Sequence, residues 1–471
     1  MEKQIAEEAE GSPSLAENIG LGEKLAYGGG DLASNLILTF AGSFLTYFYT
    51  DTVGMPIATI GTILLLSRIF DGVSDVFMGF LMDKTRSKHG KARPWLLWLA
   101  VPIGVMTVLM VTIPPLRQGY SDRDLLWRSI YIFISYNLIS TVLYTAINIP
   151  YGALTSLMTR DQYQRSVINI YRMGLAALGN AVVSNVTLPV INALGATQGS
   201  WVTLACVYGG ASTVLFLVCF RRTKERVTAG NTEAASKIPI KESLKAMLQN
   251  GPWLLIGAAG LVVSLAMAFF SFSSIYYAKY ILGNDNLVGP FSMATFIPGA
   301  ISILGMAPFI KKYGKRNAAL VGVLIAAAGQ AVIYINPASV PIILVSGAIR
   351  GFGLGPIAGT SFAMVADTIE YGEWKTGFRV QGMLYSASTF GGKVGSGLGA
   401  AAASSLLGAA GYNGLLAVQP ASALRMIRVL FLVTPLIAAA ALIVCLYLYK
   451  LDKIYPQVIA DLQARELKEE S

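Results

Sequence analysis

Four polar residues in the stretch RIFDGVSDVF, which begins at Arg68, have the types and spacing of a cation-binding site. Arg68, Asp71 and Asp75 are three and four residues apart, so they share one face of a helix, with Ser74 at its edge. Two carboxylates on one face supply oxygen ligands for a small monovalent cation such as Na+, or share a proton whose pKa their repulsion raises. The alternative is a helix-packing ion pair with Arg68 or Arg172, but one arginine needs only one carboxylate.

A second group of polar residues, in the stretch YTAINIPYG, suits a sugar. Tyr144, Thr145, Asn148 and Tyr151 recur at helical spacing, and Pro150 loosens the backbone among them. Amide and hydroxyl groups both donate to and accept from sugar hydroxyls, and aromatic rings stack on the apolar faces of a sugar. The alternative is that these groups form hydrogen bonds between helices, with an aromatic ring at the membrane interface.

Charged residues also lie inside other apolar runs. A charge at bilayer depth costs about 2.5 to 3.5 kcal/mol, so we expect such residues to face each other or a watery cavity. In YGGGDLASN, Asp31 and Asn35 share one helix face. The further interior charges are Arg172, Lys279, Arg350 and Lys393, with Asp367 and Glu370 near the end of their run.

Long apolar helices must position these polar groups. The composition predicts such helices along the whole chain. Of the 471 residues, 54% are hydrophobic and 13% are charged, against roughly 25% charged in a soluble domain. Runs of about 20 apolar residues cross a bilayer. The sequence therefore predicts an all-α membrane protein with twelve transmembrane helices, at residues 25–50, 57–82, 94–113, 128–157, 164–190, 200–221, 252–281, 289–311, 317–336, 340–370, 378–409 and 421–450.

The basic residues alternate between the predicted loops. Of the 36 lysines and arginines, 26 fall in the loops and tails on one side of the predicted helices. Positive charge marks the cytoplasmic side, so we expect a multi-pass protein of the cell inner (plasma) membrane with both termini in the cytoplasm. The net charge of +10 reflects the lysines and arginines of these loops. We therefore expect no nucleic acid partner.

The longest internal polar segment divides the predicted helices into six and six. The segment follows residue 221, and the basic loops GFLMDKTRSKHGKAR and GMAPFIKKYGKR stand at corresponding places in the two halves. Two similar halves around a central site predict the major facilitator fold and alternating access, against a channel or a structural bundle. The predicted units are a tail (1–24), a first bundle (25–221), a linker (222–250), a second bundle (251–450) and a tail (451–471).

The motifs YGGGDLASN, RIFDGVSDVFMGFLMDKTRSKHGKARPW, NIPYGAL, DTIEYGEWKTGFR and FGGKVGSG occur in one order across nearly the whole chain. In this combination the sequence resembles the glycoside-pentoside-hexuronide:cation symporter family of the major facilitator superfamily. The resemblance implies secondary active transport of a sugar or glycoside with Na+, Li+ or H+, and no cofactor. It implies cation binding, as Na+ or another coupling ion, at Asp71, Ser74, Asp75 and Thr145.

In the expected transport cycle, one set of residues binds the sugar and another forms a cytoplasmic gate. The sugar residues are Asn35, Arg68, Tyr144, Asn148, Tyr151, Arg172 and Lys393. The gate, which latches the outward-facing state by ion pairs, comprises Asp83, Arg86, Lys91, Arg93, Asp367, Glu370 and Arg379.

Departures from the family pattern leave the ion and the sugar open. Ser74 replaces an asparagine that matters for Na+ in some members, which keeps H+ coupling in view. Asn35 and Asn148 replace the two aspartates of galactoside carriers. Arg172 and Lys393 suit a glucuronide or other hexuronide, whereas their pairing with Asp71 and Asp75 would leave a pocket for a neutral pentoside.

Two other functions fit the same fold: a transporter of lipids, lysolipids or other amphiphiles, and a sugar sensor that does not transport. An enzyme is not expected, because the sequence offers no nucleophile with its base, no metal cluster and no phosphate loop. We expect the protein to function as a monomer in the lipid bilayer, with a sugar and a monovalent cation as its partners.

Overall fold

In this computed structural model the apolar runs form long helices, because a chain surrounded by lipid must pair its own backbone groups. Every regular element among the described residues is a helix, as the sequence predicts. The structure describes residues 19–114, 121–159, 162–226, 240–377, 381–416 and 418–469; Arg379 and the side chains of Arg68, Asp75 and Asp83 lie outside the described part.

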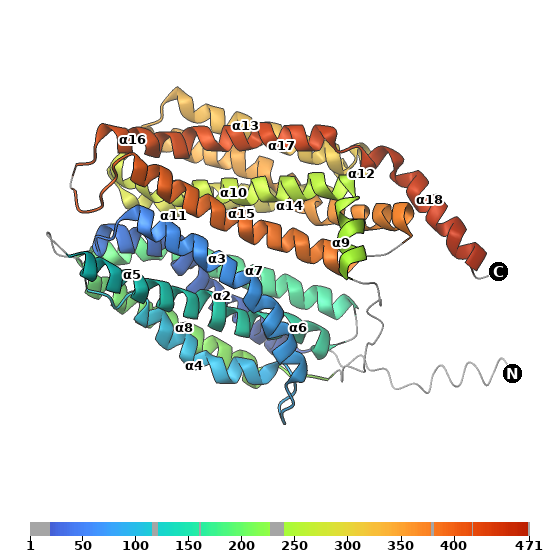
Figure 1. Cartoon of the computed structure of the whole chain (residues 1–471), viewed down its shortest axis with the longest axis horizontal. Coiled ribbons are helices and arrows are strands. Elements are labelled where there is room, and N and C mark those ends of the chain that lie inside the picture. Colours follow the sequence, from blue (N-terminus) through green and yellow to red (C-terminus); the bar gives the residue numbers. More distant parts are fainter. Residues whose placement is uncertain are drawn as a thin grey trace.

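The helices up to residue 222 form one bundle, drawn from blue to green in Figure 1. They are α2 (Leu21–Tyr47), η1 (Phe48–Thr52), α3 (Ile57–Lys84), α4 (Arg93–Leu109), α5 (Asp122–Asn137), η2 (Leu138–Leu143), α6 (Tyr144–Met158), α7 (Gln162–Ala193) and α8 (Gln198–Arg222).

The later helices form a second bundle beside the first, drawn from yellow-green to red. They are α9 (Ile240–Leu248), α10 (Gly251–Tyr280), η3 (Asp285–Leu287), α11 (Val288–Gly305), α12 (Ala307–Tyr313), α13 (Lys315–Val332), η4 (Ile333–Ile335), α14 (Val340–Thr376), α15 (Gln381–Ala409), α16 (Ala421–Arg428), η5 (Val429–Val433), α17 (Thr434–Leu448) and α18 (Leu451–Glu469).

Nine helices in the described part are long and apolar enough to cross a membrane, and the segments Ile57–Ser67 and Arg93–Leu109 are shorter apolar helices. The count of twelve membrane spans stays a prediction, as do the predicted domain boundaries. Three details go beyond the sequence. Met306 interrupts the predicted eighth span between α11 and α12, helix α9 lies in the predicted linker, and α18 occupies the predicted C-terminal tail.

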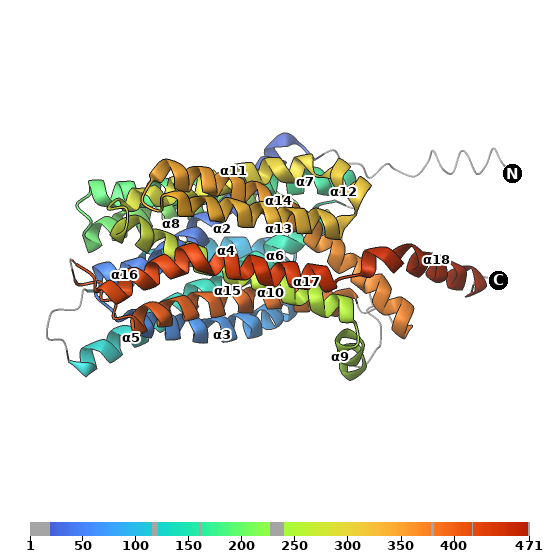
Figure 2. The same cartoon turned by 90° about the horizontal axis from the view of Figure 1, so that it is seen from above.

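The elongated molecule has two distinct ends. Helix α16 and the start of α5 lie at one end, whereas α9, α12 and α18 lie at the other, in both views (Figures 1 and 2). We call these the α16 end and the α18 end.

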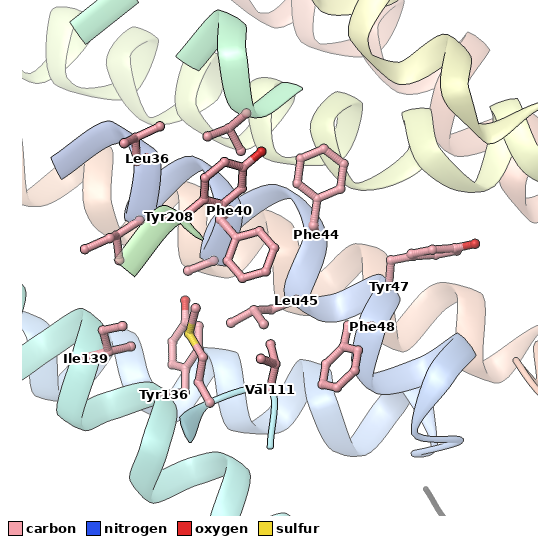
Figure 3. Packing of buried hydrophobic residues seen from close by; sticks show 14 of the residues in the cluster. Leu36, Phe40, Phe44, Leu45, Tyr47, Phe48, Val111, Tyr136, Ile139 and Tyr208 are labelled. Carbon is pink, nitrogen blue, oxygen red and sulfur yellow. The ribbon is translucent and has the colours of Figure 1, made fainter. Parts of the chain in front are cut away.

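Aromatic packing holds α2 inside the first bundle. Figure 3 shows Phe40, Phe44 and Phe48, four residues apart along the helix and each fully buried. The Phe40 ring lies edge-on to Tyr208 of α8 at 5.5 Å, and the Phe48 ring lies 5.1 Å from Trp201 of α8. Such ring pairs stabilise a helix contact beyond the apolar area that they bury, so α2 is a rigid support for the polar residues it carries.

The two bundles meet closely toward the α16 end. A Cβ atom added to Gly61 of α3 would lie 2.7 Å from the Ser404 Cβ of α15, and one added to Gly289 of α11 would lie 2.7 Å from the Asn185 Cα of α7. Small residues permit helices to approach this closely, and van der Waals packing then holds them.

Candidate functional site

The predicted cation residues of α3 and α6 come together in the interior of the first bundle. Asp71 is 8% exposed and Thr145 is 3% exposed. The Ser74 hydroxyl lies 3.5 Å from the Thr145 Oγ1 atom, and it donates to the backbone oxygens of Asp71 at 2.9 Å and Thr141 at 3.1 Å. A buried aspartate and two neighbouring hydroxyl groups are residue types whose oxygens suit a small hard cation.

The backbone beside this cluster is irregular. Helix η2 is a π-helical segment that ends at Leu143, immediately before Tyr144 and Thr145, and Pro150 lies inside α6. Such segments widen a helix locally and are frequent at functional sites. The side chain of Asp75 lies outside the described part, so its place in the cation cluster stays a prediction.

Arg172, one of the predicted sugar residues, has a partner that the sequence did not identify. Its Nε atom donates to Asp31 Oδ2 at 2.7 Å, and the side chains are 27% and 11% exposed, respectively. The guanidinium lies over the Tyr151 ring, 5.1 Å from its centre. The positive charge is therefore already balanced by a carboxylate of α2, and it remains partly accessible.

The Tyr151 ring packs against the guanidinium of this ion pair. Its ring stacks on Tyr27 at 4.6 Å, its hydroxyl donates to the Tyr27 backbone oxygen at 2.6 Å, and the Tyr27 hydroxyl donates to the Tyr151 backbone oxygen at 3.0 Å. The Tyr151 hydroxyl is buried and bonded within the protein, and its ring lies under Arg172, so the predicted contact of Tyr151 with a sugar stays a prediction.

The other predicted sugar residues lie on α2, α6 and α15. Asn35 donates to the Asp31 backbone oxygen at 2.8 Å, and Asn148 and Tyr144 are half-buried on α6. Lys393 is half-buried on α15, in the second bundle. Arg68 lies outside the described side chains.

A polar seal, which the sequence did not predict, joins the bundles at the α16 end. Asp51 of η1 accepts from Lys279 at 2.6 Å, from Tyr280 at 2.8 Å and from Tyr412 at 2.7 Å. Its side chain is only 3% exposed. Two features of the sequence could have pointed to this seal: the interior lysine of α10 and the acidic residue that follows the aromatic run YFYT.

Neighbouring contacts extend the seal. The Thr50 hydroxyl lies 3.2 Å from the Tyr276 hydroxyl, and Tyr47 donates to Asp285 at 3.2 Å. Asn192 of α7 donates to Asp285 at 2.9 Å. Each contact joins the first bundle to the second, so this end of the interface is closed.

The predicted gate residues, at the α18 end, make contacts within their own bundles. The Arg93 side chain donates to the Phe220 backbone oxygen at 2.7 Å, Lys315 pairs with Asp367 at 2.6 Å, and Tyr455 donates to Glu370. Glu225 accepts from the backbone N–H of Lys91 at 2.9 Å. Whether these residues also pair across the bundles, as the predicted latch requires, stays a prediction. Arg86 is exposed, and Asp83 and Arg379 are the gate residues whose side chains lie outside the described part.

Arg350, another interior charge, is held by neutral partners in the second bundle. It donates to Gln330 Oε1 at 2.9 Å and Thr295 Oγ1 at 3.0 Å, and it lies 3.7 Å from the centre of the Phe270 ring. Because these partners satisfy the buried guanidinium, Arg350 holds α11, α13 and α14 together.

Comparison with known proteins agrees with this architecture. The chain is 32% identical over 453 residues to the isoprimeverose transporter of Lactiplantibacillus pentosus, covering 95% of this chain and 92% of that protein. It is 29% identical over 441 residues to the putative glycoside/cation symporter YagG of Escherichia coli, covering 93% and 94%. The structure matches a bacterial homologue of the human lysosomal transporter Spinster with a TM-score of 0.61 at 12% identity, covering 95% and 98%.

The family match spans nearly all of the two bundles, up to the start of α18. The model of the family described as "MFS/sugar transport protein" matches residues 26–453, which includes the predicted cation and sugar residues and the seal. The chain belongs to this family of major facilitator transporters, and it is a multi-pass membrane protein.

Proposed function

We propose that this protein is a symporter that carries a pentoside, a glucuronide or another glycoside together with Na+, Li+ or H+. The most similar relatives named above are an isoprimeverose transporter and a putative glycoside/cation symporter, which supports a glycoside substrate and a coupling cation. The protein acts as a transporter and not as an enzyme, as a monomer within the bilayer.

The observation that carries the proposal is the seal at one end of the interface between the bundles. Asp51 and Lys279 belong to different bundles and pair at 2.6 Å, while Arg93 and Asp367, two of the predicted gate residues at the opposite end, have partners within their own bundles. A site between two bundles that is closed on one side and released on the other is the arrangement that alternating access requires.

In this cycle the cation binds Asp71, Asp75, Thr145 and Ser74, and the sugar contacts Asn35, Tyr144, Asn148, Arg172 and Lys393. Cation binding neutralises the carboxylates of the cation site, while Arg172, partly exposed and held by Asp31, orients the sugar. Each ligand then raises the affinity for the other by the same factor.

The orientation follows from the basic loops. The α18 end carries the lysines and arginines of the loop after α3 and of the junction between α12 and α13, so it faces the cytoplasm of the cell inner membrane. The α16 end faces outward. The described conformation is therefore inward-facing, with the outer seal closed.

Counterflow in proteoliposomes tests the proposal. Vesicles loaded with an unlabelled xyloside, glucoside, glucuronide or galactoside are diluted into the same labelled sugar, with Na+ or with a change in pH. Transient accumulation of at least one sugar supports a transporter. Sugar binding without counterflow would indicate a sensor. If the protein neither binds nor exchanges a sugar but exchanges a labelled lysolipid, it is an amphiphile carrier.

A further inference from the structure

A cavity of about 360 Å³ lies between the two bundles, beside the outer seal. Its wall is built from α2 and α5 of the first bundle and α10 and α15 of the second, with Leu64 of α3 at one side. The volume falls within the range of small-molecule sites, roughly 300 to 1,000 Å³.

Hydroxyl groups and aromatic rings line this cavity. The serine and threonine hydroxyls belong to Ser43, Thr46, Ser264, Ser271 and Ser396, and the rings include Tyr136 and Phe272. All the lining residues that the structure describes are uncharged.

Four of these hydroxyls are available to a ligand. Ser396 donates to the Lys393 backbone oxygen at 2.8 Å, but within the described part of the chain no protein hydrogen bond is formed by the hydroxyls of Ser43, Thr46, Ser264 or Ser271. Each of them can both donate and accept, which is what a sugar hydroxyl needs from its partner.

The cavity connects the seal with the predicted binding residues. Tyr47 and Tyr276 line the cavity and also take part in the seal. Leu64 precedes Asp71 by seven residues on α3, which is two turns or roughly 10 Å, and Ser396 is one turn from Lys393 on α15. A ligand in this cavity would therefore lie on the outer side of the predicted cation and sugar residues.

The charges favour an uncharged ligand here. Arg172 is balanced by Asp31, and the cavity wall offers neutral hydroxyls. A hexuronate carboxylate placed among them would lose its hydration without gaining an opposite charge, whereas a neutral ring would exchange water for hydroxyl partners.

We propose that this cavity is a binding subsite for a neutral sugar ring, held by Ser43 and Thr46 of α2 and by Ser264 and Ser271 of α10. The inference rests on the proposed glycoside transport and names its substrate class as neutral glycosides. Because the hydroxyls come from both bundles, opening of the outer seal separates them, so the subsite is complete only while the seal is closed.

Binding to the purified full-length protein tests the subsite. The probes are isoprimeverose, methyl β-D-xyloside, and the matched pair methyl β-D-glucoside and methyl β-D-glucuronide, which differ only in the charged carboxylate. We expect a neutral probe to bind, and the glucuronide to bind at least ten times more weakly than the glucoside. Equal or tighter binding of the glucuronide would overturn the proposal.

Substitutions in the cavity give the second arm. Thr46→Val removes one hydroxyl without changing the shape and should weaken binding about three- to ten-fold, Thr46→Ser should keep it, and Ser271→Leu should abolish it by filling the space. The matched control is Thr203→Val on the exposed face of α8, which should bind as the wild type.

Two negative results have different meanings. If the wild type binds sugar but Thr46→Val and Ser271→Leu leave the affinity unchanged, the subsite is wrong and the proposed transport stands. If the wild type binds and transports none of the sugars tested, both are wrong. Gel filtration and thermal unfolding of each variant confirm that it is folded.

Discussion

Asp51 and Lys279 form an ion pair at 2.6 Å that joins residues 228 positions apart and closes one end of the interface between the two bundles. The carboxylate is 3% exposed, and the Lys279 ammonium also lies 4.7 Å from the centre of the Tyr47 ring. A carboxylate at this depth is stable only with its partners in place. The pair therefore stabilises the closed state of this end and is lost when the end opens.

We expect Asp51→Asn to shift the protein toward states open at the α16 end, because the amide keeps the size of the side chain but removes the attraction to Lys279. The measurement is labelling of a Ser43→Cys reporter, in a protein without its native cysteines, by an impermeant maleimide added outside. Ser43 lies in the cavity beside the seal, so its labelling should rise several-fold.

Asp122→Asn is the matched control, because Asp122 is an exposed acid at the same end. It should leave the labelling rate unchanged. The charge swap Asp51→Lys with Lys279→Asp should restore part of the protection. Equal labelling of Asp51→Asn and the wild type would show that the seal does not hold the closed state.

Arg172→Met should lower both stability and sugar affinity. It leaves the Asp31 carboxylate, 11% exposed, without its cation, which costs about 1–3 kcal/mol. The measurements are the thermal unfolding temperature and sugar binding in detergent.

The double variant Arg172→Met with Asp31→Asn separates the two effects. It removes the unpaired charge, so the unfolding temperature should recover while sugar binding stays lost. Normal sugar binding by either variant would remove Arg172 from the sugar site.

Thr145→Val should weaken the response to the cation. Thr145 Oγ1 is a buried oxygen 3.5 Å from the Ser74 hydroxyl, and valine replaces it with a methyl group of similar size. The cation concentration that gives half-maximal sugar binding should rise about ten-fold, whereas Thr145→Ser should resemble the wild type. An unchanged cation response in Thr145→Val would exclude this oxygen as a ligand.

Gly90→Ala should destabilise the loop between α3 and α4. Gly90 has a φ of +101°, and a Cβ there would lie 2.3 Å from the Glu225 carboxylate. That carboxylate accepts from the backbone N–H groups of Lys91, Ala92 and Arg93, each at 2.9 Å. We expect a lower unfolding temperature, by about 1–3 kcal/mol of stability.

Gly210→Ala is the control for the loop variant, since a Cβ at that helical position meets nothing within 4 Å. Its unfolding temperature should be equal to or above that of the wild type. A Gly90→Ala protein as stable as the wild type would show that Glu225 does not depend on this close approach.

The helices were predictable because lipid leaves the backbone no alternative to internal hydrogen bonds. Because a charge inside the membrane is costly, the sequence alone also predicted that Asp71, Arg172 and Lys279 face partners or a watery cavity. Their partners were not predictable. Asp31 lies 141 residues from Arg172, and Asp51 lies outside the predicted first span, so only tertiary packing brings these residues together.

The hydroxyl-lined cavity shows the same limit on a smaller scale. Ser271 and Ser273 are two residues apart on α10, yet Ser273 donates to the Phe269 backbone oxygen of its own helix while Ser271 lines the cavity. Local sequence does not distinguish these roles, because the facing helices α2 and α15 decide which serine meets open space.

The most direct test of cation-coupled transport is the accumulation of a labelled glycoside in proteoliposomes under an imposed inward gradient of Na+ or H+. The wild type should concentrate the sugar only when the gradient of its coupling ion is present. Asp71→Asn should lose this accumulation while sugar counterflow persists, because the buried carboxylate supplies the coupling and not the pathway. Accumulation by Asp71→Asn equal to that of the wild type would contradict the account.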